Sequence, residues 1–132
     1  GPVGQGAALK LAMNQLIAGL TATFALSLGL VRGEGIPVET FMGLLRESAL
    51  YAKTFDKKLP NYLEGSYGAA NFPLKHLLKD IRLFRAVALS HGLDPRMTEA
   101  MEAVWSQALE QGLGDLDYSA VYQTLSGQPE SS

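Results

Sequence analysis

The sequence contains no cysteine and only two histidines. The lack of cysteine excludes a disulfide framework, a thiol nucleophile and a cysteine-ligated metal. Neither histidine stands at metal-ligand spacing from carboxylates, so we expect no metal site. Charge is scarce as well: 18% of the residues are charged and the formal net charge is −2. A nucleic-acid partner usually requires a basic surface, and we therefore expect none here.

Strand-like alternation is also lacking, because apolar residues recur at helical spacing throughout the chain. The 132 residues are 47% hydrophobic, which is enough to bury a real core. The chain is nevertheless too short for a catalytic domain together with a full dinucleotide-binding unit. We predict one all-α domain over residues 1–125, followed by a disordered tail at residues 126–132.

Residues 11–31 contain no charged side chain and reach the length that crosses a bilayer. The run includes polar residues such as Asn14 and Ser27, and neither an aromatic belt nor a basic cluster marks its ends. No basic segment precedes it, as a secretory signal would require. We therefore expect no membrane span and a cytoplasmic protein. A helix that is apolar almost all round must be buried on most sides, which suggests a homodimer, a homotetramer or a further domain.

Helix boundaries follow from glycines after apolar stretches and prolines before them. In the helix predicted at residues 95–111, the side chains expected to face inward are Met97, Met101, Val104, Trp105 and Leu109. In the helix predicted at residues 37–49, the buried apolar stripe ends at Ala49. A capping residue, Asp117, precedes the last helix. The predicted long first helix and four shorter ones cover residues 7–31, 37–49, 73–91, 95–111 and 118–125, with an irregular segment at 51–71 that holds one short helix near 55–63.

Lys10 and Asn14 stand one helical turn apart, behind a segment with glycines at positions 1, 4 and 6. The glycine spacing reverses that of a dinucleotide fingerprint and no strand precedes it, which argues against a phosphate cradle. Two other interpretations stay open, a close backbone approach to an anion at the helix entrance and a flexible terminus. Lys10 itself is either a snorkelling end-group or a proton donor in a low-dielectric site.

A second group of polar residues lies on the predicted helix at 73–91. Lys75, Lys79 and Arg82 share one face, where like charges repel unless an anion lies against them. A solvated basic face is the simpler interpretation. His76 and Asp80 lie on a neighbouring stripe one turn apart, and they could form an ordinary surface pair.

Three segments together resemble one enzyme family. Residues 1–14 resemble the G-x-x-G-x-G-x-x-x-K-x-x-x-N segment of the β-hydroxyacid dehydrogenases, the family of 3-hydroxyisobutyrate dehydrogenase. Residues 72–83, which read F-P-L-K-H-L-L-K-D-I-R-L, resemble the family's K-D-x-x-L-A segment, and especially the corresponding run of glyoxylate/succinic semialdehyde reductases. Residues 112–121 are similar to the C-terminal end of the same subgroup.

The resemblance implies a helical C-terminal domain of the 6-phosphogluconate dehydrogenase-like type, whose partner Rossmann domain lies outside this chain. It implies an NADP- or NAD-dependent reduction of a small aldehyde acid to its hydroxy acid, and an isolated chain that is inactive. Carried over by position, the catalytic residue is Lys10, the substrate-binding residues are Asn14, Phe72 and Asp80, and the cofactor-binding residue is Lys79.

Lys10 would polarise the substrate carbonyl and supply a proton, provided that burial and neighbours bring its pKa towards neutrality. One departure from the family pattern is the middle of the first helix, where residues 23–26 include no acid. Two alternatives remain, a non-catalytic helical dimerisation module on the same scaffold and an imine reductase domain. The joint presence of Lys10, Asn14, Lys79 and Asp80 favours the reductase over the module, because a pure scaffold has no packing need for that set. The lysine favours carbonyl over imine reduction.

Overall fold

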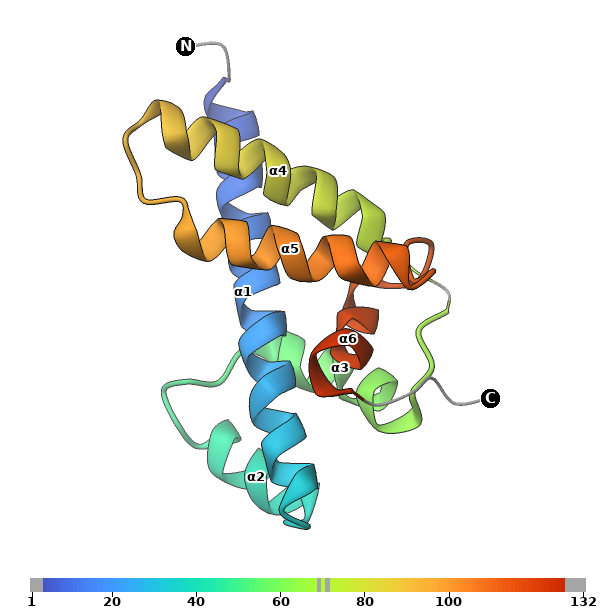
Figure 1. The fold of residues 1–132 in the computed structure, drawn as a ribbon. Helices are drawn as coiled ribbons and strands as arrows, with labels where there is room; N and C mark the ends of the chain where they lie inside the picture. Colours follow the sequence, from blue (N-terminus) through green and yellow to red (C-terminus); the bar gives the residue numbers. More distant parts are fainter. Residues whose placement is uncertain (1–3, 69, 71, 128–132) are drawn as a thin grey trace.

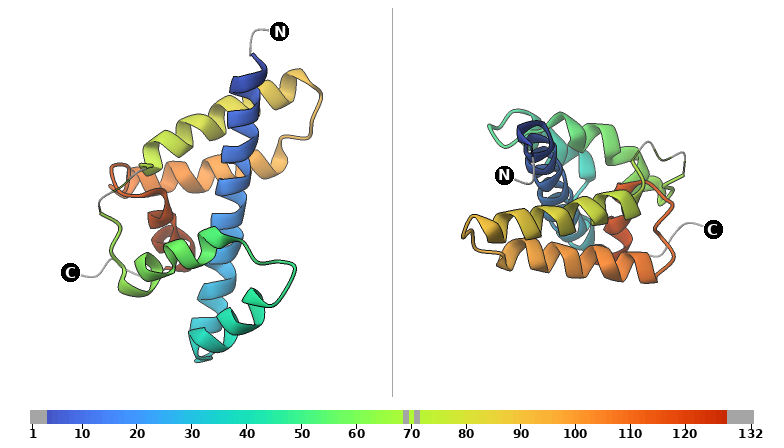
Figure 2. Two further views of the ribbon diagram at one scale, coloured as in Figure 1. Left: turned by 180° about the vertical axis from the view of Figure 1, so that it is seen from behind. Right: turned by 90° about the horizontal axis from the view of Figure 1, so that it is seen from above.

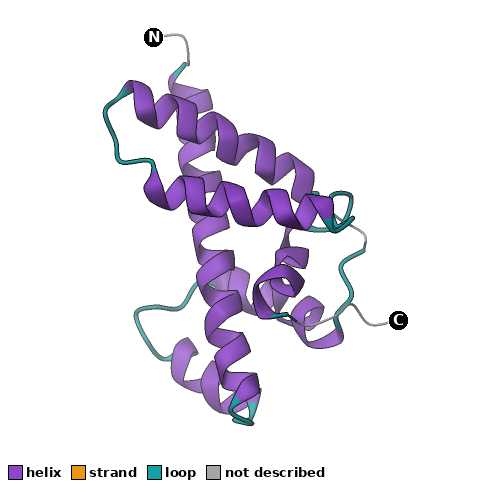
Figure 3. Cartoon of the chain, viewed as in Figure 1, coloured by secondary structure: helices purple, strands orange, loops and turns teal. Residues whose placement is uncertain are grey.

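The computed structural model describes residues 4–68, 70 and 72–127, and these residues are helical with no strand (Figures 1 and 3). The all-α prediction is therefore confirmed. The elements are α1 (Gln5–Gly33), α2 (Val38–Arg46), α3 (Lys53–Glu64), α4 (Leu74–Ser90), α5 (Arg96–Glu110), the short 3₁₀-helix η1 (Tyr118–Ala120) and α6 (Val121–Ser126).

Helix α1 runs the length of the molecule, and the other helices pack along it (Figure 1). Helices α4 and α5 form an antiparallel pair that crosses the N-terminal half of α1, as the view from above in Figure 2 shows. Helices α2 and α3 lie at its C-terminal half, with α6 packed against it as well. Because α1 and α4 cross, residues near the start of the chain lie next to residues more than sixty positions later in the sequence.

The core combines aromatic rings with one apolar stripe from each long helix. The Phe24 and Phe55 rings stack with their centroids 4.6 Å apart, and Trp105 is fully buried. The apolar stripe of α4 is buried at Leu74, Leu77, Leu78 and Ile81. Burial of these side chains is the main source of the fold's stability.

Within this chain the first helix is not buried on most sides, so the burial that we expect there would have to come from a second copy or a further domain. Within the described residues its buried positions follow a single stripe, while Leu9, Met13 and Leu16 on another face are between 60% and 68% exposed. The stripe is narrow because only one layer of helices covers α1 in this chain. By length and composition α1 is the one described helix that would suffice to cross a membrane, a test that core helices also pass.

The short helix predicted near residues 55–63 is present as α3, which is slightly longer than expected. It is regular although it includes Pro60, and it lies within a segment, residues 51–71, that we otherwise predict to be irregular. The helix persists because Phe55 and Tyr62 are buried against α1 and α6, and this packing outweighs the hydrogen bond that proline removes.

Smaller corrections concern single positions. Met97 is 81% exposed and Leu109 40% exposed, because each lies near an end of α5 where no helix covers it. Helix α2 ends at Arg46, so Ala49 is outside it. Ser126 is the last residue of α6 rather than part of a tail, and residues 128–132 lie outside the described part. The capping role of Asp117 is confirmed, since its carboxylate accepts a bond from the Ser119 backbone N–H.

Candidate functional site

Residues from the start of α1 and from α4 meet around one hollow. Helix α1 contributes Lys10, and α4 with the residue two positions before it contributes Phe72, His76, Lys79 and Asp80. The hollow has a volume of about 300 Å³. The spacing explains the arrangement, because positions four apart lie on one side of a helix. The structure therefore brings together four of the five residues that the sequence singled out.

The fifth residue, Asn14, lies beside the hollow and is joined to it through Asp80. Its amide Nδ2 donates a 2.7 Å hydrogen bond to Asp80 Oδ2, and Lys10 Nζ lies 3.7 Å from the same oxygen. The Asp80 side chain is only 7% exposed, and a buried carboxylate is unfavourable without such partners. Asp80 thus connects α4 to both polar residues of α1.

The Lys10 side chain, in contrast, is 67% exposed. The low-dielectric surroundings that a tuned proton donor requires are therefore not supplied by this chain alone. The Lys10 amine lies beside the Asp80 carboxylate, and the rest of its surface is accessible to solvent or a ligand.

The basic face of α4 is mostly neutralised by carboxylates of the same chain. Lys75 Nζ lies 2.6 Å from Asp115 Oδ1 and holds the pKa of that carboxyl below its usual range. Arg82 makes a similar pair with Glu102 at 3.1 Å. Lys79 makes no ion pair within the described residues, and it lies at the hollow. A lysine without a carboxylate partner, placed beside a hollow, is better explained by an anionic ligand than by a solvated basic face.

The wall formed by Phe72 is held by the first residue of η1. The Phe72 carbonyl accepts a 3.0 Å bond from the Tyr118 N–H, and the two rings meet edge to face at 5.8 Å. The first turn of α4 is anchored in the same way, since the N–H groups of Leu74 and Lys75 donate to carbonyls of residues 116 and 114. These bonds satisfy N–H groups that have no partner within the helix.

His76 is the lining residue to which the sequence analysis gave no role. It was considered as a surface partner of Asp80, but the Asp80 carboxylate bonds to Asn14 instead. Its position one turn after Phe72 and one turn before Asp80 was the signal that could have placed it in the site. A Cβ atom at Gly4 or Gly6 would meet nothing within 4 Å, so the close approach that we considered there involves no described part of this chain.

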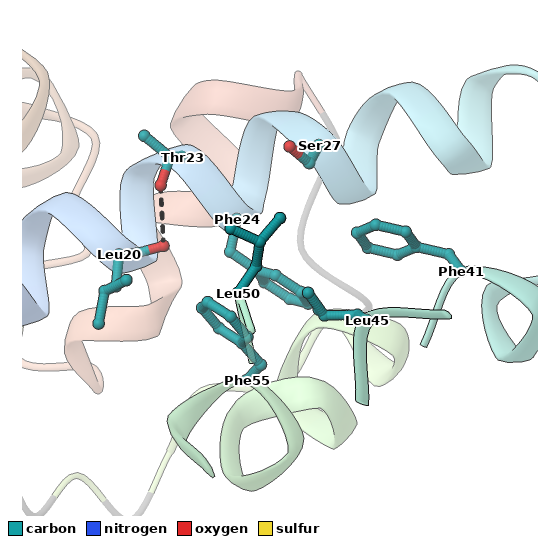
Figure 4. Close-up of a pocket in the computed structure, with 8 residues that line it drawn as sticks. All are labelled: Leu20, Thr23, Phe24, Ser27, Phe41, Leu45, Leu50 and Phe55. Carbon is teal, nitrogen blue, oxygen red and sulfur yellow. Dashed lines mark hydrogen bonds between the residues drawn. The ribbon is translucent and has the colours of Figure 1, made fainter. Parts of the chain in front are cut away.

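A second hollow, of about 290 Å³, lies between α1, α2 and the start of α3 (Figure 4). No residue lines both hollows. The second one includes Thr23, the first residue of the segment in which the family pattern has an acid, and its hydroxyl donates to the Gly19 carbonyl of its own helix at 2.8 Å. The lining carries no charge, and its residues are Leu20, Thr23, Phe24, Ser27, Phe41, Leu45, Leu50 and Phe55.

Among the described residues no group of three histidine, aspartate or glutamate side chains could hold a metal ion. The polar side chains that meet at the site are Lys10, Asn14 and Asp80. Their arrangement offers an ammonium and an amide that are held by one buried carboxylate. Such a group can donate a proton to, and orient, a small oxygen-bearing ligand.

Three proteins are similar to this chain in sequence. Glyoxylate/succinic semialdehyde reductase 1 of Arabidopsis thaliana is 34% identical over 95% of the chain, and the chloroplastic reductase 2 of the same plant is 33% identical over the same share. The human cytokine-like nuclear factor N-PAC is 32% identical over 93% of the chain. The chain spans 43%, 35% and 22% of the lengths of these three proteins.

A solved structure shares the fold. The 3-hydroxyisobutyrate dehydrogenase of Salmonella typhimurium superposes with a TM-score of 0.80 over 91% of this chain and 42% of its own, at 21% identity. Residues 4–125 match the family described as the NAD-binding domain of NADP-dependent 3-hydroxyisobutyrate dehydrogenase. The chain therefore belongs to this family of NAD(P)-dependent dehydrogenases, whose cofactor is NAD or NADP.

Proposed function

We propose that this chain is the substrate-side half of a reductase that converts a small aldehyde acid, such as glyoxylate or succinic semialdehyde, to the hydroxy acid. One observation carries the proposal: Lys10, Asn14 and Asp80, which lie on two helices, form a bonded group beside the hollow that Phe72 and Lys79 also line. The names of the plant reductases suggest the substrate class.

The residues present fit a nicotinamide dinucleotide at the rim of this hollow. Lys79 offers a cation that no carboxylate of the described chain neutralises, which suits a phosphate-bearing ligand. When bound, the cofactor supplies the hydride. We propose that a dinucleotide-binding domain elsewhere in the protein holds most of it, because the chain spans less than half of the reductases it matches.

In the proposed reaction the carbonyl carbon gains a hydride and the carbonyl oxygen gains a proton. Lys10 polarises the oxygen and donates that proton, and it regains one from water through its exposed side. Asn14 orients the substrate oxygen or the lysine, and Asp80 fixes Asn14 by the 2.7 Å bond. Phe72 forms an apolar wall against the body of the substrate.

We also propose that the protein assembles as a homodimer or homotetramer through α1. The apolar side chains of Leu9, Met13 and Leu16 repeat at helical spacing and are mostly exposed, so a second copy would remove them from water. A cytoplasmic location and the absence of nucleic-acid and membrane partners remain predictions from the sequence.

The test is turnover by the complete protein that contains this chain. We expect reduction of glyoxylate or succinic semialdehyde with NADPH or NADH, and a loss of kcat of about a thousandfold or more in Lys10→Ala with nearly unchanged cofactor binding. Lys57→Ala, which changes an exposed lysine on α3, is the matched control and should keep wild-type kcat. A Lys10→Ala variant that retains most of its kcat would contradict the role of the lysine. The 132-residue chain alone should be inactive.

The likeness to N-PAC, which is named a cytokine-like nuclear factor and not a reductase, supports a second candidate, a non-catalytic helical module. It predicts that the complete protein binds a second copy but reduces no aldehyde acid with either cofactor. The turnover assay therefore separates the two candidates directly.

A further inference from the structure

A buried ion pair lies outside the hollow and has no part in the proposed chemistry. Lys58 Nζ of α3 is 3.0 Å from Asp117 Oδ1, and the two side chains are only 11% and 4% exposed. Removing two charges from water is unfavourable, and their attraction often does no more than compensate for it. Stability is therefore a weak explanation for this pair, and a role in positioning has to be considered.

The pair fixes the backbone around Asp117. The second oxygen of its carboxylate accepts bonds from the Ser119 N–H, at 3.1 Å, and from the Ser119 hydroxyl. Asn61 of α3 donates to the same hydroxyl at 3.1 Å, and the Asp117 N–H donates to the Tyr67 carbonyl at 2.8 Å. These bonds connect α3, and the residues that follow it, to Asp117 and to Ser119 of η1.

Tyr118, the next residue, links this cluster to the hollow. The Lys58 ammonium lies 4.7 Å from the centre of the Tyr118 ring, a favourable cation–π arrangement. Tyr118 also contacts Phe72. Their rings pack edge to face, and the Tyr118 N–H donates a 3.0 Å hydrogen bond to the Phe72 carbonyl. Phe72 in turn lines the hollow.

We propose that Lys58 and Asp117 are positioning residues, which hold Phe72 in the wall of the substrate hollow through Tyr118. The role as a substrate wall rests on the proposed reductase function. Lys58, Asp117 and Tyr118 do not line the hollow themselves. Their replacement should therefore change the fit of the aldehyde acid but leave proton transfer and cofactor binding unaffected.

The main variant is Lys58→Met with Asp117→Asn in the complete protein. It removes both charges at similar volume, and asparagine keeps an acceptor for the Ser119 N–H. We expect the KM for the aldehyde acid to rise about tenfold, with kcat and the cofactor Kd within about twofold of wild type. A folded double variant with wild-type KM would overturn the proposal.

Tyr118 supplies the matched control. Tyr118→Phe keeps the ring and should leave the KM unchanged, whereas Tyr118→Leu removes both ring contacts and should reproduce the rise in KM. A wild-type KM in Tyr118→Leu would contradict the link. Single Lys58→Met leaves a carboxylate buried without its cation, so its Tm should fall below that of the double variant.

Amide hydrogen exchange separates this proposal from the reductase function itself. In the double variant the protection of the Tyr118 N–H, which bonds to Phe72, should fall about tenfold, while amides within α5 keep theirs. If the wild type reduces no aldehyde acid but this protection falls, the reductase function fails and the positioning link stands. Unchanged protection would refute the link whatever the activity.

Discussion

The hydrogen bond between Asn14 and Asp80 offers the sharpest test of how the site is held together. It joins two residues 66 positions apart, and Asp80 is almost fully buried. We predict that Asn14→Ala destabilises the chain, because among the described residues the Asp80 carboxylate then keeps only Lys10, at 3.7 Å, as a partner. That contact involves a largely exposed lysine and contributes little.

The magnitude follows from two terms. A buried hydrogen bond to a charged group contributes about 2 kcal/mol. Alanine is the better helix former within α1 by about 0.6 kcal/mol, which offsets part of the loss. The expected net decrease in the free energy of unfolding is therefore about 1.4 kcal/mol, or about 5 °C in Tm for a chain of this length.

The assay is a double-mutant cycle with Asp80→Ala, followed by urea unfolding of the 132-residue chain. Trp105 is the single tryptophan and is fully buried, so its fluorescence reports loss of the core. The helix-propensity term is the same in both backgrounds and cancels in the cycle. We expect a coupling free energy of about 2 kcal/mol between the two positions.

A coupling near zero would refute the reasoning, since Asn14→Ala would then act equally with or without the carboxylate. The cycle does not depend on catalysis. A positive result therefore supports the geometry of the site, and the Lys10→Ala kinetics separately test its chemistry.

Two further predictions concern pH and assembly. Hydrogen bonds from Arg46 and Tyr51 lower the pKa of Asp56 from 3.8 to about 2, so the stabilisation is present above pH 4 and is lost as the pH falls towards 2. Asp56→Asn should flatten acid unfolding in that window, and an unchanged slope would contradict this. Leu16→Glu should weaken self-association in sedimentation, whereas Leu63→Glu on α3 should not; equal association in both variants would argue against an interface on α1.

Local patterns were sufficient for much of the fold. Apolar spacing of 3.6 residues and helix-ending glycines predicted a helix at or near each of the six observed α-helices. The weakest of these predictions was the short helix near 55–63, where Pro60 argued for an irregular segment and the burial of Phe55 and Tyr62 supports the twelve-residue α3. A proline signal is local, and packing against distant helices can outweigh it.

The same division applies to the candidate site. Helical spacing places Lys10 with Asn14, and Phe72 with His76 and Asp80, on common faces. No local rule reveals that α1 crosses α4 at these turns, because the crossing depends on which apolar stripes pack together in the whole chain.

The sequence by itself therefore determined the helices, their faces and the residues that resemble a family site. Only the tertiary structure decided that Asp80 bonds to Asn14 rather than His76, that no carboxylate of the described residues pairs with Lys79, and that Lys58 is buried against Asp117. These are contacts between segments far apart in the chain, and they are set by the packing of the core rather than by neighbours in sequence.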